Sequence, residues 1–171
     1  LLRDVAFATW DAGGLRRVTL DLDGTVIRTG ERAEGAARGF HPHHPKDPSY
    51  YPLTAHLAQT GQLLGVWNRP GNTHDSVGAV ERLRELIAEI RSRLGPVPVE
   101  VRLDGAFCQK AVLELLSASR VDYALRLPMW EWLGVRDRIA RRRAWTRVNA
   151  SVDAFSMPVR IEPWKRTERV V

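Results

Sequence analysis

The sequence VTLDLDGT at residues 18–25, together with VPVEVRLDG at residues 97–105, decides the fold. In both stretches apolar residues alternate with polar ones, a pattern typical of a β-strand with one buried face. Each strand ends in an aspartate, Asp23 in the first and Asp104 in the second. If the two strands lie side by side, their carboxylates meet, and a hard divalent cation is the usual reason to tolerate that repulsion. The pattern therefore predicts a metal site.

The elements around these strands indicate an α/β chain. A turn at Thr60-Gly61 joins two strands into a hairpin, and apolar residues at three- and four-residue spacing predict a long helix after it. That helix is expected to begin at a cap, Thr73 or Asp75, and to stop at Gly95. The strands are expected at residues 16–22, 50–59, 63–68, 97–103 and 121–127, and a second helix at 109–119.

Strands that follow helices are typical of parallel crossovers, whereas a hairpin is antiparallel. The predicted fold class is therefore an α/β, ribonuclease-H-like mixed sheet, with three antiparallel strands and then parallel strands with crossover helices. In this topology the first and fourth strands are neighbours, and these carry Asp23 and Asp104. A short helix over 130–138 and β-like stretches after it predict the start of a β-rich region.

The composition predicts a globular domain with a nucleic-acid partner. The 171 residues are 44% apolar, which suits a compact domain with a real core. No apolar run approaches the roughly 20 residues that span a bilayer. The net charge is +6 with few lysines (Lys46, Lys110 and Lys165), so arginine carries nearly all the positive charge. Arginine binds phosphate bidentately, although GC-rich codons give the same bias. The single cysteine, Cys108, excludes an internal disulfide and favours a reducing, cytoplasmic setting.

Several motifs lie in order between and around the two aspartates. They are GERAEGAARGF at residues 30–40, PSYYPL at 48–53, RPGN at 69–72 and RLDGAF at 102–107. With the Asp23-x-Thr25 strand end, this series resembles the catalytic core of bacterial insertion-sequence transposases of the DDE superfamily, from about Val18 to about Leu127. Phe40-His41 stands where that family usually has Tyr-Asn, and Tyr51 stands where it usually has His, which is typical of a diverged copy.

The resemblance implies metal-dependent DNA strand cleavage and strand transfer. Asp23 and Asp104 would be the catalytic residues and would bind Mg²⁺ (or Mn²⁺). The family's third acidic ligand is a glutamate on a late helix, and it is expected outside this chain. The chain is therefore expected to be an internal fragment with little activity of its own. The implied partners are transposon-end and target DNA and, for the intact protein, a second copy, with no membrane, in the bacterial cytoplasm at the nucleoid.

The resemblance also divides the chain into regions. Residues 1–15 are expected to end a preceding segment, 16–128 to form the incomplete catalytic core, and 129–171 to begin the β-rich insertion. The candidate DNA-contacting residues are Arg69, Asn72, Arg102, Arg141, Arg142 and Arg143. Each has an alternative interpretation: Arg69 and Asn72 would shape a turn, Arg102 would pair with an acid, and the arginine run would be a solvated face.

Two other functions remain open. The stretch DLDGT at residues 21–25 also resembles the first motif of haloacid-dehalogenase-type phosphatases, in which Asp21 would attack phosphate and Asp23 would act as acid and base. That family needs a later lysine and a downstream acidic pair, and Lys110 is the only mid-chain lysine. The non-enzymatic alternative is a domesticated transposase remnant that binds DNA without cutting it. The histidines at positions 41, 43 and 44 suggest zinc, but the prolines between them and the lack of cysteine partners argue against it.

Overall fold

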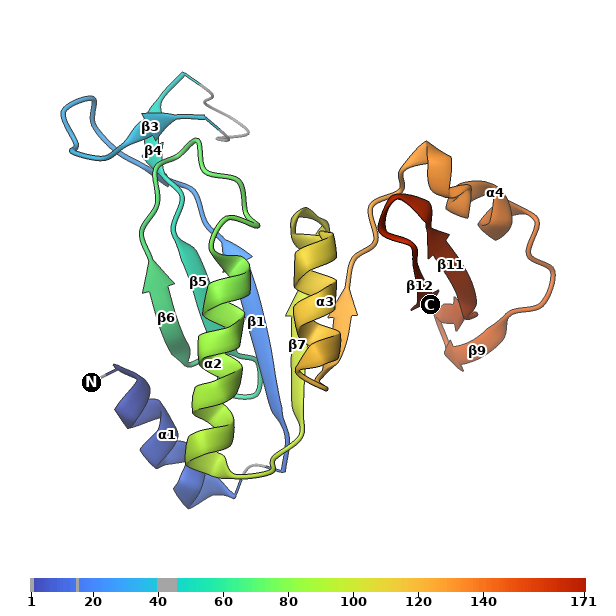
Figure 1. Cartoon of the computed structure of the whole chain (residues 1–171), viewed down its shortest axis with the longest axis horizontal. Helices are drawn as coiled ribbons and strands as arrows, with labels where there is room; N and C mark the ends of the chain where they lie inside the picture. Colours follow the sequence, from blue (N-terminus) through green and yellow to red (C-terminus); the bar gives the residue numbers. More distant parts are fainter. Residues whose placement is uncertain (1, 15, 40–45) are drawn as a thin grey trace. The chain divides into compact units, whose positions relative to one another are not determined.

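A computed structural model describes residues 2–14, 16–39 and 46–171 of the chain. These residues form two compact units, Leu1–Arg126 and Leu127–Val171 (Figure 1). The sequence-based division, with boundaries at residues 15 and 128, differs from these units mainly at its start, because the first helix belongs to the larger unit. No helix among the described residues is long and apolar enough to cross a membrane.

The larger unit is built on a five-stranded mixed sheet with the strand order β6-β5-β1-β7-β8. Strands β1, β5 and β6 are antiparallel, and β7 and β8 continue the sheet parallel to β1. The strands are β1 (Val18–Gly24), β5 (Leu53–Leu57), β6 (Leu63–Trp67), β7 (Val99–Leu103) and β8 (Asp122–Leu125). This order confirms the predicted ribonuclease-H-like class and makes β1 and β7 neighbours.

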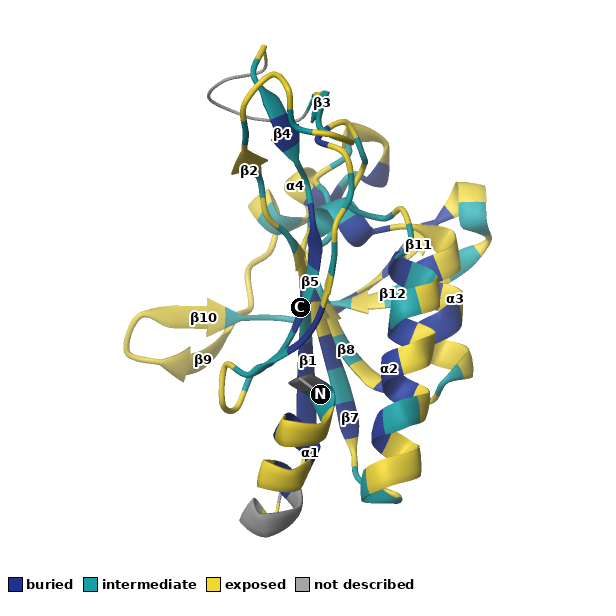
Figure 2. Ribbon diagram, turned by 90° about the vertical axis from the view of Figure 1, so that its left-hand side faces the viewer, coloured by how far each residue is buried: buried dark blue, intermediate teal, exposed yellow. Residues whose placement is uncertain are grey.

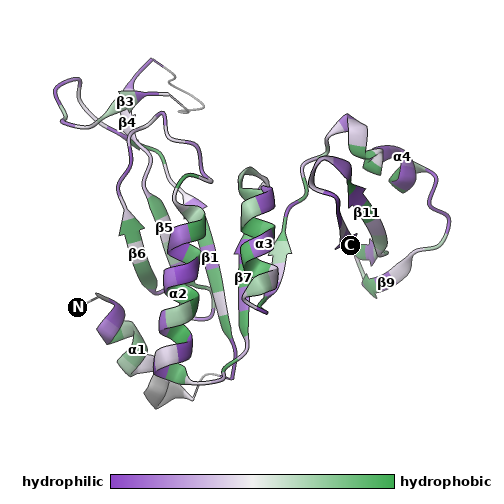
Figure 3. Cartoon of the chain, viewed as in Figure 1, coloured by the Kyte–Doolittle hydropathy of each residue, from purple (hydrophilic) through white to green (hydrophobic). Residues whose placement is uncertain are grey.

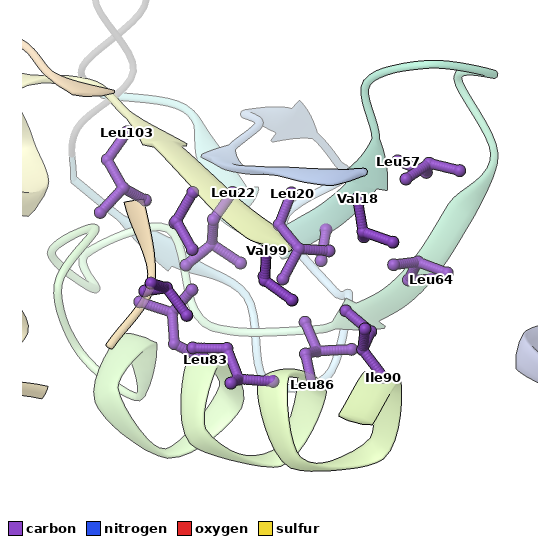
Figure 4. Packing of buried hydrophobic residues seen from close by; sticks show 14 of the residues in the cluster. Val18, Leu20, Leu22, Leu57, Leu64, Leu83, Leu86, Ile90, Val99 and Leu103 are labelled. Carbon is purple, nitrogen blue, oxygen red and sulfur yellow. The ribbon is translucent and has the colours of Figure 1, made fainter. Parts of the chain in front are cut away.

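One face of the sheet is covered by helices α2 (Ala79–Leu94) and α3 (Lys110–Ala118), which lie on the same side in Figure 2. Helix α2 is amphipathic, with hydrophilic and hydrophobic faces that alternate along it in Figure 3. Its Leu83 and Leu86 pack against Leu20 and Leu22 of β1 in the core (Figure 4). The other face of β1 carries Thr19, Asp21 and Asp23, because side chains alternate along a strand.

Helix α1 (Leu2–Gly13) was not predicted from the sequence. Its Ala6, Phe7 and Trp10 are almost fully buried and belong to the same core as the sheet. The Trp10 indole Nε1 donates a hydrogen bond to Gln62 Oε1 at 2.5 Å, which ties the helix to the hairpin turn. The spacing of these three apolar residues was the available signal, but the turn residues after them drew attention away from it.

Two predicted boundaries were wrong. Helix α2 begins at Ala79, after Gly78 in the left-handed conformation (φ 79°), so neither Thr73 nor Asp75 is its cap. The predicted strand over 50–59 is two strands in two sheets, because Pro52 cannot donate a ladder hydrogen bond and separates β4 (Pro48–Tyr50) from β5. Gly95 does end α2, with φ 72° and its N–H bonded to the Arg91 carbonyl, as the sequence indicated.

A small second sheet lies within the predicted long loop. It has the order β2-β4-β3, with β2 (Ile27–Arg28) and β3 (Ala37–Arg38) on either side of β4. Gly71 packs tightly on this sheet, because a Cβ there would lie 2.7 Å from the Ser49 carbonyl oxygen and closer still to the Ser49 hydroxyl. The three histidines at 41, 43 and 44, on which the zinc interpretation rests, lie outside the described residues.

The smaller unit consists of short elements. A 3-10 turn η2 (Glu131–Leu133) and helix α4 (Val135–Ala140) precede the hairpin of β9 (Thr146–Asn149) and β10 (Val152–Ala154). Strands β11 (Met157–Ile161) and β12 (Arg166–Val170) follow, with the 3-10 turn η3 (Glu162–Trp164) between them. Met157, Val159 and Ile161 are buried, whereas every residue of β9 is exposed (Figure 2).

Candidate metal and nucleic-acid site

Asp23 and Asp104 lie at the same edge of the sheet, where the parallel strands β1 and β7 end. The last register pair between these strands is Leu22 with Leu103, and the two aspartates are the next residue on each strand. Asp104 begins the 3-10 turn η1 (Gly105–Phe107), and its Oδ1 accepts a hydrogen bond from Ala106 N at 2.9 Å. Asp23 Oδ1 accepts one from Gly24 N at 2.8 Å.

The electrostatics at this edge leave negative charge uncompensated. Asp23 is exposed at its edge, yet burial of its carboxylate is the largest cause that raises its pKa. The Gly24 N–H opposes this increase, the charges of Asp104 and Asp75 add to it, and His56 opposes it. Carboxylates that repel one another and hold back few hydrogen bonds suit a hard divalent cation, which prefers oxygen ligands. Among residues 2–14, 16–39 and 46–171, no group of three acidic, histidine or cysteine side chains is placed to hold a metal.

Asp75 is a functional candidate that sequence reasoning treated only as a helix cap. The Tyr51 hydroxyl donates a hydrogen bond to its carboxylate; burial, this bond and the nearby acidic charges raise the pKa of Tyr51. Both side chains press on Gly24, where an added Cβ would lie 2.7 Å from Tyr51 Cζ and closer still to Asp75 Oδ1. No spacing in the sequence relates Asp75 to Asp23, because only the tertiary fold brings them together.

Arg69 is used inside the protein rather than presented to a ligand. Its Nε donates to the Tyr51 carbonyl at 2.9 Å, and its Nη1 donates to the carbonyls of Asp75 at 3.1 Å and Val77 at 2.8 Å. Burial lowers the pKa of its guanidinium, which lies over the Tyr51 ring. These bonds match the turn-shaping alternative for Arg69. Asn72 is exposed, and its backbone packs on Gly39, where a Cβ would lie 2.5 Å from Asn72 Cα.

Arg102 forms a two-bond ion pair with Asp21 on the helix-free face of the sheet. The residues are register partners on β7 and β1, and the Arg102 Nε and Nη2 atoms lie 2.6 and 2.5 Å from the two carboxylate oxygens. This contact is the acid-pairing alternative for Arg102. It also engages Asp21, the residue that the phosphatase interpretation requires as a nucleophile, and Lys110 pairs with Glu114 at 3.6 Å.

Arg141, Arg142 and Arg143 follow α4 in the smaller unit, and all three are exposed. Arg142 Nε donates to the Ala144 carbonyl at 2.7 Å, and its guanidinium lies 4.8 Å from the centroid of the Phe155 ring. Most of the chain's excess positive charge lies in this unit. Its 45 residues hold 10 basic and 5 acidic side chains, so 10 − 5 = +5 of the +6 total. Such a surface suits a phosphate backbone.

Comparisons with known proteins agree with the fold and the two aspartates. A family model described as "Transposase DDE domain group 1" matches residues 2–171. Among solved structures, the Mos1 transposase paired-end complex with the left transposon end has 13% identity and a TM-score of 0.44, covering 71% of this chain and 39% of that one. The catalytic domain of Mos1 mariner transposase has 10% identity and a TM-score of 0.46, covering 84% of this chain and 70% of that one.

A third similar structure is the Mos1 mariner paired-end complex with Mn, at 11% identity and a TM-score of 0.41, covering 81% of this chain and 52% of that one. The chain thus spans about 39% of the length of the Mos1 chain in the complex with the left transposon end. A search of curated protein sequences gave no match.

Proposed function

Because the chain belongs to the DDE transposase family, we propose that it is part of a catalytic core that cleaves DNA strands and transfers them during transposition of an insertion sequence. The observation that supports this most directly is the placement of Asp23 and Asp104. Each is the residue after the last register pair of two neighbouring parallel strands. Two carboxylates brought together in this way form the beginning of a metal site for phosphoryl transfer.

In this proposal Asp23 and Asp104 bind Mg²⁺ or Mn²⁺. A bound divalent cation supplies activation of the attacking hydroxyl and stabilisation of the leaving oxygen. The backbone N–H groups of Gly24 and Ala106 orient the two carboxylates. The third acidic ligand comes from outside these 171 residues, as the resemblance implies, so the isolated chain has little or no cleavage activity.

DNA contacts are proposed for the smaller unit, which corresponds to the start of the β-rich insertion over 129–171. Arg141, Arg142 and Arg143 neutralise backbone phosphates there, with Asn72 as a further exposed contact in the larger unit. The substrates are transposon-end and target DNA, held by two copies of the intact protein. Bacterial genomic DNA as substrate places this activity in the cytoplasm, at the nucleoid.

Strand cleavage in Mg²⁺ by the 171-residue chain and by the full open reading frame that encodes it tests the proposal. We expect cleavage of DNA carrying the element's terminal repeats by the full protein, little by the chain, and loss of cleavage in Asp23→Asn and Asp104→Asn. Asp122→Asn, the same change on an exposed strand, serves as the control and should cleave normally. Robust cleavage by the chain alone would contradict the external third ligand. DNA binding without cleavage by the full protein would instead identify a domesticated remnant.

A further inference from the structure

The segment His74–Val77, which lies between the RPGN turn and helix α2, contacts the backbone or neighbours of both aspartates. On one side, Asp75 Oδ1 and the Tyr51 hydroxyl close around Gly24, the residue after Asp23. On the other side, Ser76 Oγ accepts a hydrogen bond of 2.6 Å from Gln109 Nε2, on the loop that follows the turn capped by Asp104. His74 Nδ1 lies 2.9 Å from the same Ser76 oxygen. The segment therefore bridges the two strand ends.

Arg69 holds this segment by its backbone and leaves the Asp75 carboxylate uncompensated. The guanidinium donates to the carbonyls of residues 74, 75 and 77 and not to the carboxylate. Among the side chains that the structure describes, only two buried nitrogen or oxygen atoms have no hydrogen-bond partner, and they are Asp75 Oδ1 and Arg69 Nη2. A buried carboxylate oxygen without a partner is costly, and such exceptions concentrate at functional sites.

We propose that Asp75 is a positioning residue of the two-aspartate site, fixing the Asp23–Gly24 segment through contact with Gly24 and adding its negative charge to the field that attracts the cation. Tyr51 supports it by donating a hydrogen bond and by closing the other side of Gly24. This inference rests on the proposed metal-dependent function. It assigns Asp75 no direct ligation, since the described residues hold no three-residue metal group.

The charge and the shape of Asp75 are separable by mutation. Asp75→Asn keeps the size of the side chain and its ability to accept the Tyr51 hydrogen bond but removes the charge. Asp75→Ala removes both and opens space beside Gly24. A purely structural residue would be rescued by Asn, whereas a residue that also supplies charge would not. Asp122→Asn, on the exposed strand β8, is the matched control because it makes the same change in net charge.

Mn²⁺ binding to the 171-residue chain, followed by electron paramagnetic resonance of the free ion up to millimolar concentration, is the test. We expect Asp75→Asn to weaken Mn²⁺ binding by about three- to tenfold, the Coulomb effect of one charge a short distance from a divalent ion at the protein surface. Asp75→Ala should weaken it further, and Asp122→Asn should match the wild type. The metal-free melting temperature of Asp75→Asn should be no lower than that of the wild type, because an unpaired buried charge is removed.

The outcomes separate this inference from the proposed function. Wild-type affinity in Asp75→Asn, together with weakened binding in Asp23→Asn, would overturn the role of Asp75 and leave the metal site standing. Equal binding by wild type and Asp23→Asn, or no binding by either, would overturn the metal site and this inference with it. A lower melting temperature in Asp75→Asn with unchanged affinity would show a structural role only.

Discussion

At the scale of single residues, the site depends on one position where no side chain fits. Gly24 follows Asp23 directly, and the space a Cβ would need is already taken by Asp75 and Tyr51. The DLDG sequence thus carries two requirements at once, a carboxylate at the strand end and a bare backbone beside it. The carboxylate was predictable from the motif. The reason for the glycine was not, because both residues that exclude a Cβ come from other elements.

Gly24→Ala is expected to destabilise the chain by about 1–3 kcal/mol, the usual cost of forcing an extra methyl group into a filled space. Urea unfolding followed by tryptophan fluorescence measures the change in the free energy of unfolding. Gly30→Ala is the matched control, because a Cβ at Gly30 meets no atom within 4 Å. Equal stability of the two variants would show that Tyr51 and Asp75 move aside freely.

Asp23→Asn is expected to reduce the pH dependence of stability in buffer without divalent cations. Burial and the charges of Asp104 and Asp75 raise the pKa of Asp23 above its unfolded value. The stability linked to this carboxyl is therefore fully present below the unfolded pKa and is lost as the pH rises through the folded pKa. Urea unfolding between about pH 4 and about pH 7 should show a smaller loss in Asp23→Asn than in the wild type. An identical loss in both proteins would contradict the charge repulsion, and Asp122→Asn should behave as the wild type.

At the scale of elements, local patterns predicted the strands and helices better than their ends. Alternation of apolar residues placed β1 and β7 correctly, because it reports directly which side of a strand is buried. The start of α2 was misplaced because residues 73–78 form a clamped turn whose contacts are with distant residues, chiefly Arg69. Asp75 was missed as a site residue for the same reason: its partners are set by tertiary structure, which no sequence spacing encodes.

Arg69→Lys tests whether this clamp holds the segment before α2. A lysine has one ammonium group and lacks the planar fork, so it cannot reach the carbonyls on both sides at once. We expect a loss of about 1–3 kcal/mol in unfolding free energy, from buried carbonyls left without donors. Hydrogen exchange should speed up in residues 74–78 before it does in the centre of α2. Arg84→Lys, on the exposed face of α2, is the control and should change neither quantity.

At the scale of the whole molecule, charge and chemistry are carried by different units. The larger unit holds Asp23, Asp75 and Asp104 and has 16 basic and 15 acidic residues, a balance of 16 − 15 = +1. The smaller unit carries the remaining +5. The composition indicated a nucleic-acid partner but gave no position for it, since net charge is a property of the whole chain. Only the division into units assigns the excess to residues 127–171.

Replacing Arg141, Arg142 and Arg143 together with alanine is expected to weaken binding to duplex DNA at every sequence and to reduce its salt dependence. If each arginine neutralises one phosphate, the slope of log affinity against log salt should become shallower by about 2.7, which is 0.9 for each contact. Fluorescence anisotropy over a salt series measures both quantities. The control replaces three exposed arginines of the larger unit, Arg16, Arg32 and Arg84, and so makes the same change in net charge. If the control shifts the slope as much as the Arg141–Arg143 variant, the attraction comes from total charge, and the arginine run after α4 is an ordinary solvated surface rather than a DNA contact.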